Sequence, residues 1–386
     1  MSANYKKLGD YITQRREKNT AIDLPICGVC REGLIPPKQQ DADISLYNVF
    51  YKNDFIFNPA RMELNSITLN TEYDKAICSS LYEIFYINDT SKLLPEFLFV
   101  QLKTDNFVRF CEFQGQGSVR EYCRFANISE YPVIVPDIKE QQKIVDAYNA
   151  ITKRIKIKQK INENLEKTAI SILNKKIGQT VFSNSTEKEI EEKKNSLPQG
   201  WKLITISEYC SKMESGSTPS RTENEYWING NIPWLKSGEV HNNITFETEE
   251  YITEKGLKET STKLLPVDTV LMAMYGVTAG EVGYLNIPAT TNQAICGMIC
   301  KNKIEAAYLY FALIQNQKMI SQMSNGGAQN NLSKAFIENM FIVVPKEDVL
   351  QKLKINVVLQ HFILTSKEIK CLNKSKQLIV SKISKR

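Results

Sequence analysis

The sequence predicts an α+β fold, in which two mixed α/β globules are separated by two long antiparallel coiled-coil helices and related by an internal pseudo-twofold repeat. The chain has 386 residues, the length of two or three ordinary domains. A segment of its first half resembles one near its end, and two long stretches show helical spacing of apolar residues. The expected parts are a first globule at 1–136, a first helix at 137–178, a linker at 179–200, a second globule at 201–345 and a second helix at 346–386.

The repeat is clearest between residues 117–144 and residues 326–353. The first segment reads GSVREYCRFANISEYPVIVPDIKEQQKI and the second reads GGAQNNLSKAFIENMFIVVPKEDVLQKL. They align without gaps, with glycine facing glycine at the start and Val-Pro facing Val-Pro further on. Shorter similarities precede both segments in the same order, which favours a duplication over chance resemblance.

Two stretches have the apolar spacing of long helices. Residues 137–177 contain neither Pro nor Gly, and their apolar residues recur at intervals of three and four. Lys158 and Asn162 interrupt this apolar seam, and polar residues at such positions can fix the register of a helix pair. Residues 346–386 alternate intervals of three and four more regularly, which is the coiled-coil pattern. The alternative is two amphipathic helices, each packed on its own globule.

The globules are expected to mix strands with short helices, and the segment between the halves is expected to be a linker. Residues 179–200 are polar and charged with few apolar positions, which indicates a connection rather than a packed element. Apolar and β-branched runs predict strands at 49–57, 77–87, 269–274 and 293–299. Helices are expected at 95–110 and 304–323.

Positive charge is concentrated on the predicted helices. Residues 138–178 and 346–386 carry net charges of +6 and +7, whereas residues 1–137 and 201–345 each carry −3. A basic helix gains affinity for duplex DNA by releasing condensed counterions. It could equally dock on an acidic protein or form a solvated lysine-rich face, so composition leaves three alternatives open.

Motifs of common enzyme and metal sites are absent or incomplete. Two histidines, His241 and His361, give no support to a histidine metal site or a Ser-His-Asp arrangement. Cys27 and Cys30 have zinc-ligand spacing, but no second Cys-x-x-Cys pair exists, so buried thiols are expected. The FQGQG string at 113–117 matches one of S-adenosylmethionine-binding methyltransferases, but a predicted helix precedes it, so we expect a turn. The chain is therefore predicted to have no catalytic or metal site.

The same inspection predicts where the protein resides. No run of 18 or more apolar residues exists, so no transmembrane helix is expected. The first residues lack the apolar core of an export signal. Nine cysteines are then expected to be reduced thiols, and the expected location is the cytoplasm.

Three polar, Gly-containing strings are rich in side chains that can read bases. They lie at 216–221, 232–239 and 326–333. Gln and Asn can bond adenine bidentately, while Arg and Lys can bond guanine. Considered alone, these strings are equally compatible with ordinary surface loops.

At these residues the chain resembles the specificity subunits of type I restriction–modification enzymes. The string YWINGNIPW at 226–234, preceded by GSTPSR at 216–221, resembles the opening of that family's target-recognition domain. In the first half, YNVF at 47–50, DFIFNPAR at 54–61 and GSVR at 117–120 resemble another branch. PDIKEQQ at 136–142 resembles the entry into the family's conserved helix. The second entry lacks the Glu-Gln pair, which leaves the start of the second helix open, and Ala60 replaces a bulkier residue.

The resemblance implies a non-catalytic subunit whose two target-recognition domains each read one half of a bipartite, asymmetric DNA site. The helix pair would set the spacer between the halves and dock two modification subunits. Restriction subunits would join the complex. S-adenosylmethionine, ATP and Mg would be held by these partners, with no cofactor on this chain. The alternatives are a specificity subunit of another restriction type, a self-sufficient methyltransferase or nuclease, and a coiled-coil scaffold that does not bind DNA.

Nine residues are candidates for contact with DNA. Each can equally contact a phosphate or simply support the local structure of its segment. In the first globule they are Arg31, Arg61, Ser118 and Arg120, and in the second they are Arg221, Lys236, Tyr275, Gln329 and Asn330.

Overall fold

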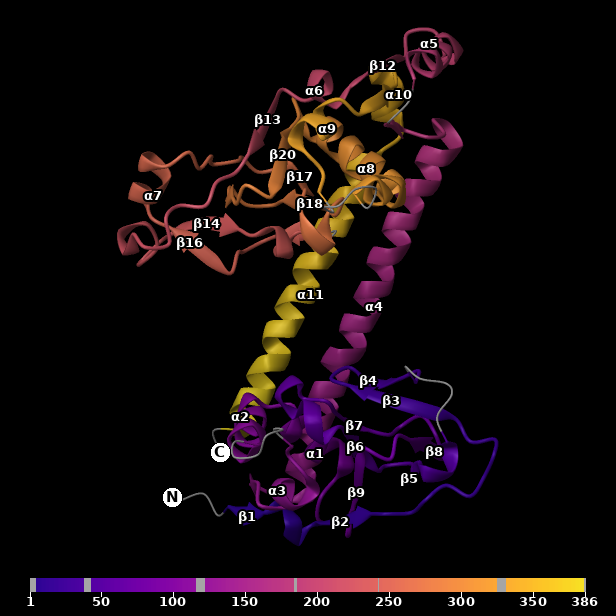
Figure 1. Cartoon of the computed structure of the whole chain (residues 1–386), viewed down its shortest axis with the longest axis vertical. Helices are drawn as coiled ribbons and strands as arrows, with labels where there is room; N and C mark the ends of the chain where they lie inside the picture. Colours follow the sequence, from indigo (N-terminus) through magenta and orange to yellow (C-terminus); the bar gives the residue numbers. More distant parts are fainter. Residues whose placement is uncertain are drawn as a thin grey trace. The chain divides into compact units, whose positions relative to one another are not determined.

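The computed structural model describes residues 5–37, 43–115, 122–183, 186–241, 243–324 and 331–384 (Figure 1). The chain forms two compact units. Unit 1 consists of 1–156 with 371–386, and unit 2 consists of 157–370. Two long helices, α4 (Ile138–Lys176) and α11 (Ile355–Ser384), each contribute one half to each unit. No helix in the described ranges is long and apolar enough to cross a membrane.

Over its described residues, unit 1 contains two four-stranded sheets, one two-stranded sheet and three short helices, besides its parts of α4 and α11. An aromatic core lies on the first sheet, where the rings of Phe55 and Phe85 stack with centroids 4.8 Å apart. The first sheet has the order β2-β9-β6-β7, with β2 (Ile12–Arg15), β9 (Glu83–Ile87), β6 (Phe55–Phe57) and β7 (Ile67–Leu69). The second has the order β4-β3-β8-β5, with β4 (Gly33–Ile35), β3 (Ile26–Cys30), β8 (Lys75–Cys78) and β5 (Asn48–Tyr51). The other elements are β1 (Lys6–Lys7), β10 (Pro132–Val133), α1 (Pro95–Leu102), α2 (Asp105–Gly115) and α3 (Phe125–Ser129).

In unit 1, turns divide three segments that the sequence predicted as single strands or helices. The strand expected at 49–57 is β5 and β6, because Asn53 takes a left-handed conformation with φ 67° and reverses the chain. The strand expected at 77–87 is likewise β8 and β9, separated by a turn closed by Tyr82 N–H donating to the Ser79 carbonyl. The helix expected at 95–110 is α1 and α2, since the Thr104 hydroxyl accepts from the Phe107 amide and starts a new helix.

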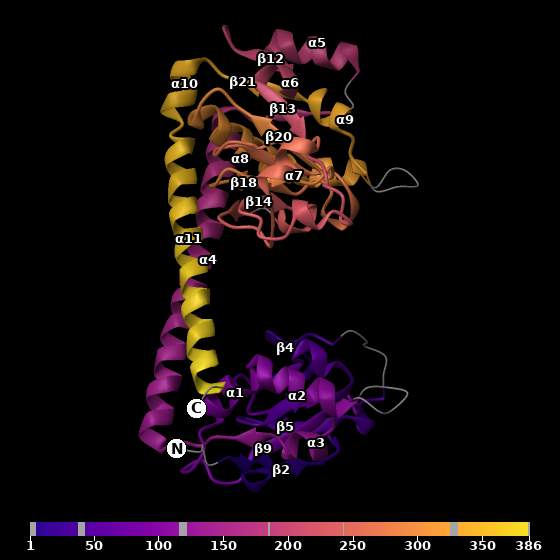
Figure 2. The ribbon, with the colours of Figure 1, turned by 90° about the vertical axis from the view of Figure 1, so that its left-hand side faces the viewer.

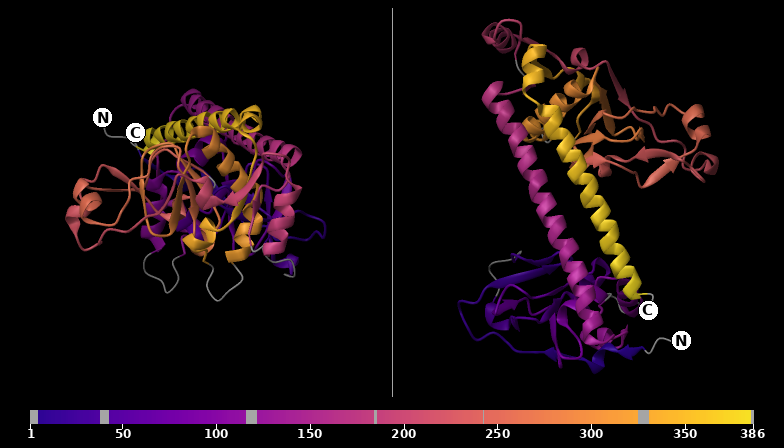
Figure 3. Two further views of the ribbon diagram at one scale, coloured as in Figure 1. Left: turned by 90° about the horizontal axis from the view of Figure 1, so that it is seen from above. Right: turned by 180° about the vertical axis from the view of Figure 1, so that it is seen from behind.

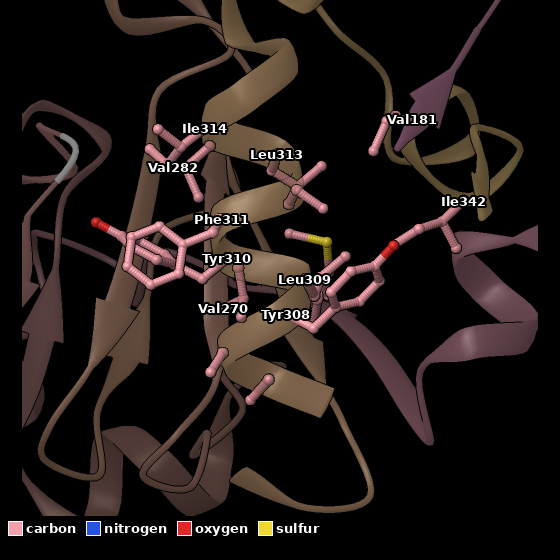
Figure 4. Packing of buried hydrophobic residues seen from close by; sticks show 14 of the residues in the cluster. Val181, Val270, Val282, Tyr308, Leu309, Tyr310, Phe311, Leu313, Ile314 and Ile342 are labelled. Carbon is pink, nitrogen blue, oxygen red and sulfur yellow. The ribbon is translucent and has the colours of Figure 1, made fainter. Parts of the chain in front are cut away.

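Unit 2 is built around helix α8 (Lys303–Ser324), which lies between two sheets. Tyr308 through Leu313 are at most 1% exposed, so this part of the helix is buried on every side. Figure 4 shows Val270 and Val282 of the larger sheet on one side of α8, and Val181 and Ile342 of a smaller sheet on the other. The Tyr308 hydroxyl donates to the Val343 carbonyl at 2.5 Å, which satisfies a polar group in this core.

The described residues of unit 2 form three sheets. The five-stranded sheet has the order β13-β20-β17-β18-β15, with β13 (Lys212–Ser215), β20 (Ile295–Ile299), β17 (Val270–Ala273), β18 (Val282–Leu285) and β15 (Ile244–Thr245). A second sheet has the order β16-β14-β19, with β16 (Glu250–Ile252), β14 (Ile232–Leu235) and β19 (Thr290–Thr291). Together with α7 (Glu254–Glu259), it lies on the side of the five-stranded sheet that faces away from α8 (Figure 3). The third sheet is β11-β21-β12, with β11 (Val181–Phe182), β21 (Phe341–Val344) and β12 (Lys202–Thr205). Short helices are α6 (Ile206–Tyr209) and α9 (Lys334–Glu338).

The segment expected to be a linker is structured. Residues 179–200 contain β11 and α5 (Glu187–Ser196). Val181 is fully buried beside β21, and Ile190 is 8% exposed, so two well-placed apolar residues anchor an otherwise polar segment. Thr186 and Glu189 form a capping box that starts α5.

The second long helix begins later than the expected residue 346. A separate short helix, α10 (Glu347–Lys352), precedes α11, and Figure 2 shows the break between them. Lys354 has φ 55°, a left-handed conformation that ends the first helix. This break follows the second entry at 345–351, which lacks the Glu-Gln pair.

The two long helices contact each other within both units. In unit 2, the Lys158 ammonium lies 2.7 Å from the Glu368 carboxylate, and the Asn162 amide donates to the Ser366 hydroxyl at 2.8 Å. The numbering rises along α4 as it falls along α11, so the helices are antiparallel there. In unit 1, the Lys376 ammonium lies 4.5 Å from the centre of the Tyr148 ring. Lys158 and Asn162, which interrupt the apolar seam, thus have polar partners on the opposite helix.

Candidate nucleic-acid interface

The segments that follow or precede five strands of unit 2 meet at one place. Hydrogen bonds join them, from Ser217 N–H to the Thr291 carbonyl at 2.9 Å, from Asn292 N–H to the Leu235 carbonyl at 3.0 Å, and from Met274 N–H to the Ala294 carbonyl at 2.8 Å. These contacts gather the ends of β13, β14, β17 and β19 with the start of β20. We call residues 216–221, 235–239, 274–278, 291–294 and 331 the strand-end surface.

Close packing at glycine explains one part of this surface. A Cβ atom on Gly216 would lie 2.0 Å from the Thr291 carbonyl oxygen, far inside van der Waals contact. The chain can therefore pass this closely over β19 only with glycine at 216. The indole N–H of Trp234 donates to the Ser217 carbonyl at 3.0 Å and secures the same loop.

Arg221 and Lys236, two predicted DNA-contacting residues, already have acidic partners. The Arg221 guanidinium lies 3.7 Å from the centre of the Trp227 ring and 2.7 Å from a Glu250 carboxylate oxygen. The Lys236 ammonium lies 2.6 Å from Glu249 and 3.5 Å from Glu250. Hydrogen bonding to Glu249 raises the pKa of Lys236. Both cations would have to exchange these carboxylates for DNA phosphates or bases in order to bind them.

Within the strand-end surface, Tyr275 contacts a segment that is far away in the sequence. The Tyr275 side chain is 41% exposed, and its backbone pairs with Asn331 in an isolated bridge. Asn331 belongs to the predicted string 326–333, so the bridge links a residue of that string to the segment after β17. Gln329 and Asn330 themselves lie outside the described residues.

Gln293 belongs to the strand-end surface but was not among the predicted residues. Its side chain is exposed, and its amide oxygen accepts a hydrogen bond from the Thr218 hydroxyl at 2.7 Å. The polar pair Asn292-Gln293 shortly before the apolar strand β20 was the available sequence signal, because polar residues that flank an apolar run indicate a turn.

In unit 1, Arg31 and Arg61 are both exposed but have different settings. Arg31 lies in the turn between β3 and β4, and the Lys103 ammonium donates to its carbonyl at 2.8 Å and to the Ile67 carbonyl at 2.7 Å. Arg61 lies in the 3-10 segment Pro59–Leu64. The amide of Cys123 donates to the Pro59 carbonyl at the start of that segment at 3.0 Å. Ser118 and Arg120 lie outside the described residues.

Another cation of unit 1, Arg15, has contacts that stabilise the fold. Its guanidinium lies 4.7 Å from the centre of both the Tyr51 and the Tyr86 rings and bonds Asp54 at 2.6 and 3.1 Å. Asp54 is 1% exposed, and the ion pair joins β2 to the turn before β6. A cation that contacts two aromatic rings and both carboxylate oxygens stabilises the fold.

The motifs considered for catalysis or metal binding have ordinary surroundings. Phe113 to Gly115 end helix α2, and the rest of that Gly-containing string lies outside the described residues. Cys27 is buried opposite Cys78, and burial raises the pKa of its thiol, which disfavours the thiolate form that binds metal. Across the described ranges, no three His, Cys, Asp or Glu side chains are grouped so as to hold a metal ion.

Comparison with known proteins identifies the family of the chain. The chain matches the type I restriction modification DNA specificity domain at residues 35–167 and again at 198–377. The MjaIX specificity subunit of Methanocaldococcus jannaschii is 25% identical over 299 residues, covering 75% of this chain and 68% of that protein. The HindI specificity subunit of Haemophilus influenzae is 20% identical over 344 residues, covering 73% and 74%.

A solved structure resembles the fold. The type I restriction–modification S subunit from M. genitalium aligns with a TM-score of 0.58 at 15% identity, covering 99% of this chain and 96% of that one. The family model covers most of the chain and matches it once in each half. The chain therefore belongs to the family of type I restriction modification DNA specificity domains.

Proposed function

We propose that this chain is the DNA sequence-specificity subunit of a type I restriction–modification complex, in which each unit reads one half of a bipartite, asymmetric site. The observation that carries the proposal is the strand-end surface of unit 2. It combines exposed Tyr275 and Gln293 with Asn331, in a chain of this family. Aromatic and amide side chains on rigid turns suit base edges in a groove.

The two units differ in sequence and strand order, so the half-sites they read should differ. The α4–α11 pair, running antiparallel as a coiled coil, would give the subunit a pseudo-twofold symmetry that suits duplex DNA. The pair would set the spacer between half-sites and dock two modification subunits, and restriction subunits would complete the complex. The net charges of +6 and +7 on residues 138–178 and 346–386 support a place near DNA or an acidic partner.

The chemistry would belong to the partners. Methylation of a base in a duplex requires that the base be flipped out of the stack. This chain would place the modification subunits over the target adenine without a catalytic group of its own. S-adenosylmethionine, ATP and Mg²⁺ would be bound by the modification and restriction subunits.

The test is to co-express the chain with its modification subunits and to map methylated adenines in the DNA. We expect one two-part sequence with a constant spacer. The Gln329→Ala variant should relax the sequence requirement in one half only, because it changes one unit. Methylation independent of sequence, or duplex binding insensitive to salt, would contradict the proposal and favour a scaffold without DNA binding.

A further inference from the structure

The turn that carries Gln293 is held on several sides. Asn292 accepts the Ala294 amide through its side chain at 3.1 Å and the Ile295 amide through its carbonyl at 3.4 Å. The backbone N–H of Asn292 donates to the Leu235 carbonyl, and the backbone N–H of Met274 donates to the Ala294 carbonyl. Ala294 and Ile295 are buried beneath it. Gln293 therefore projects from a backbone that is fixed by β14, β17 and β20.

The Gln293 side chain is also oriented. The Thr218 hydroxyl donates to its amide oxygen at 2.7 Å, in an exposed setting. This contact leaves the second lone pair of that oxygen and both N–H groups of the amide for other partners. Thr218 lies in the loop held over β19 by Gly216 and Trp234, so the contact connects two fixed segments.

The charged neighbours are less available than this amide. Arg221 and Lys236 are bound to Glu249 and Glu250 within hydrogen-bond distance. A neutral amide exchanges only hydration for a base contact, whereas these cations must first leave a carboxylate. The strand-end surface thus presents Gln293 as a preorganised donor and acceptor.

We propose that Gln293 reads an adenine in the major groove of the half-site recognised by unit 2, and that Thr218 is a positioning residue for it. This inference rests on the proposed function. The amide nitrogen would donate to adenine N7, and the amide oxygen would accept from adenine N6 while still bonded to Thr218. Adenine is the base whose major-groove edge offers this donor and acceptor pair to an amide.

The experiment uses the complex of the full chain with its modification subunits and duplexes carrying the mapped site. Each base pair of the unit 2 half-site is changed in turn, and methylation rates are compared. Gln293→Ala should reduce discrimination at one A·T position by about 10- to 100-fold and leave the other positions and the other half-site unchanged. Gln293→Glu should shift preference there toward cytosine, because a carboxylate accepts from cytosine N4 but cannot donate to N7.

Thr218 is tested by a conservative series. Thr218→Val should weaken discrimination at the same base pair, and Thr218→Ser should restore it because the hydroxyl is retained. Gln351→Ala, which removes an exposed glutamine on α10 of the same unit, is the matched control and should change nothing. Unchanged unfolding temperatures would show that the variants remain folded.

Three results would overturn the inference. An unaltered methylation pattern in Gln293→Ala would make the residue an ordinary turn residue. Uniform loss over all half-site sequences would make it a phosphate contact, which carries no sequence information. Lost discrimination at a pair other than A·T would assign another base. If the wild-type complex has no sequence preference, the proposed function fails instead, and the two failures are thereby distinguished.

Discussion

At the scale of single residues, the pairing of each side chain decides what it can do. Arg221 and Lys236 have the side chains expected of DNA-contacting residues. Both are nevertheless paired with acidic residues: Arg221 with Glu250, and Lys236 with Glu249 and Glu250 at the start of β16. Exposed ion pairs of this kind contribute little to stability. Their larger consequence is for binding, because they compete with phosphate for the same cations.

We predict that Glu250→Gln strengthens binding of non-specific duplex DNA. Loss of this carboxylate releases Arg221 and weakens the hold on Lys236, so more cations can displace counterions from DNA. The slope of log affinity against log salt, measured by fluorescence anisotropy, should steepen by about one. Glu254→Gln on α7, an exposed carboxylate of the same unit, is the control. An identical slope in both variants would show that Arg221 and Lys236 do not reach DNA.

Lys103 predicts a pH dependence of stability in unit 1. Burial, and then the nearby charge of Arg31, lower the pKa of Lys103 from 10.5 to about 7. Between about pH 7 and 10 the unfolded chain binds the proton that the folded chain has released, so the free energy of unfolding rises with pH. Urea titrations at pH 6.5 and 9 should show this rise in the wild type and a smaller one in Lys103→Met. Exposed Lys52→Met is the control, and equal rises in all three proteins would contradict the assignment.

At the scale of elements, the long helices combine an apolar seam with polar contacts between them. Asn162 donates to Ser366, and its other amide atom, the buried Oδ1, has no hydrogen-bond partner in the described structure. Buried polar groups cost stability when they lose a partner, but they restrict the ways in which two helices can pair. The pair thus favours one register over maximal stability.

We expect Ser366→Ala to lower the free energy of unfolding by about 1–3 kcal/mol, because it removes the partner of the Asn162 amide. Adding Asn162→Leu should recover most of that loss, since an apolar pair leaves no polar group unsatisfied. Equilibrium urea unfolding of the two single variants and the double variant gives the coupling between the sites. Additive effects would mean that the contact carries no interaction energy.

Elements also show where reasoning from the sequence stopped. Apolar runs placed the strands near 49–57 and 77–87, but each run contains two strands, because a left-handed Asn53 and a turn at Ser79 reverse the chain. The polar segment 179–200 holds a strand and a helix, since β11 pairs with a strand from far along the chain. Pairing partners and turn conformations depend on residues that no local window contains.

At the scale of the whole molecule, the proposed function treats α4 and α11 as a ruler between half-sites. Inserting seven residues at matched positions near the middle of both helices keeps the heptad seam and adds about 10 Å, close to three base-pair steps. We expect the methylated site to keep both half-sites while its spacer grows by about three base pairs. Sequencing of methylated adenines measures this.

The control for that insertion is the same seven residues added to α4 alone, which shifts the seam on one side and should weaken assembly. An insertion in both helices that changes a half-site, or leaves the spacer as it was, would contradict the ruler. Both outcomes leave the assignment of the family unaffected, since that rests on the matches at 35–167 and 198–377.

The sequence by itself determined the repeat, the long helical stretches and the family, because these depend on the order and spacing of residues along the chain. It also pointed to the polar loops of unit 2 as the candidate interface. Only the tertiary structure decided which side chains in those loops are free of protein partners that would compete with DNA. Arg221 and Lys236 are bound by carboxylates, whereas Gln293 is presented by Thr218 from a strand end far away in the chain. Availability is a property of neighbours in space, and sheet pairing, rather than sequence distance, brings those neighbours together.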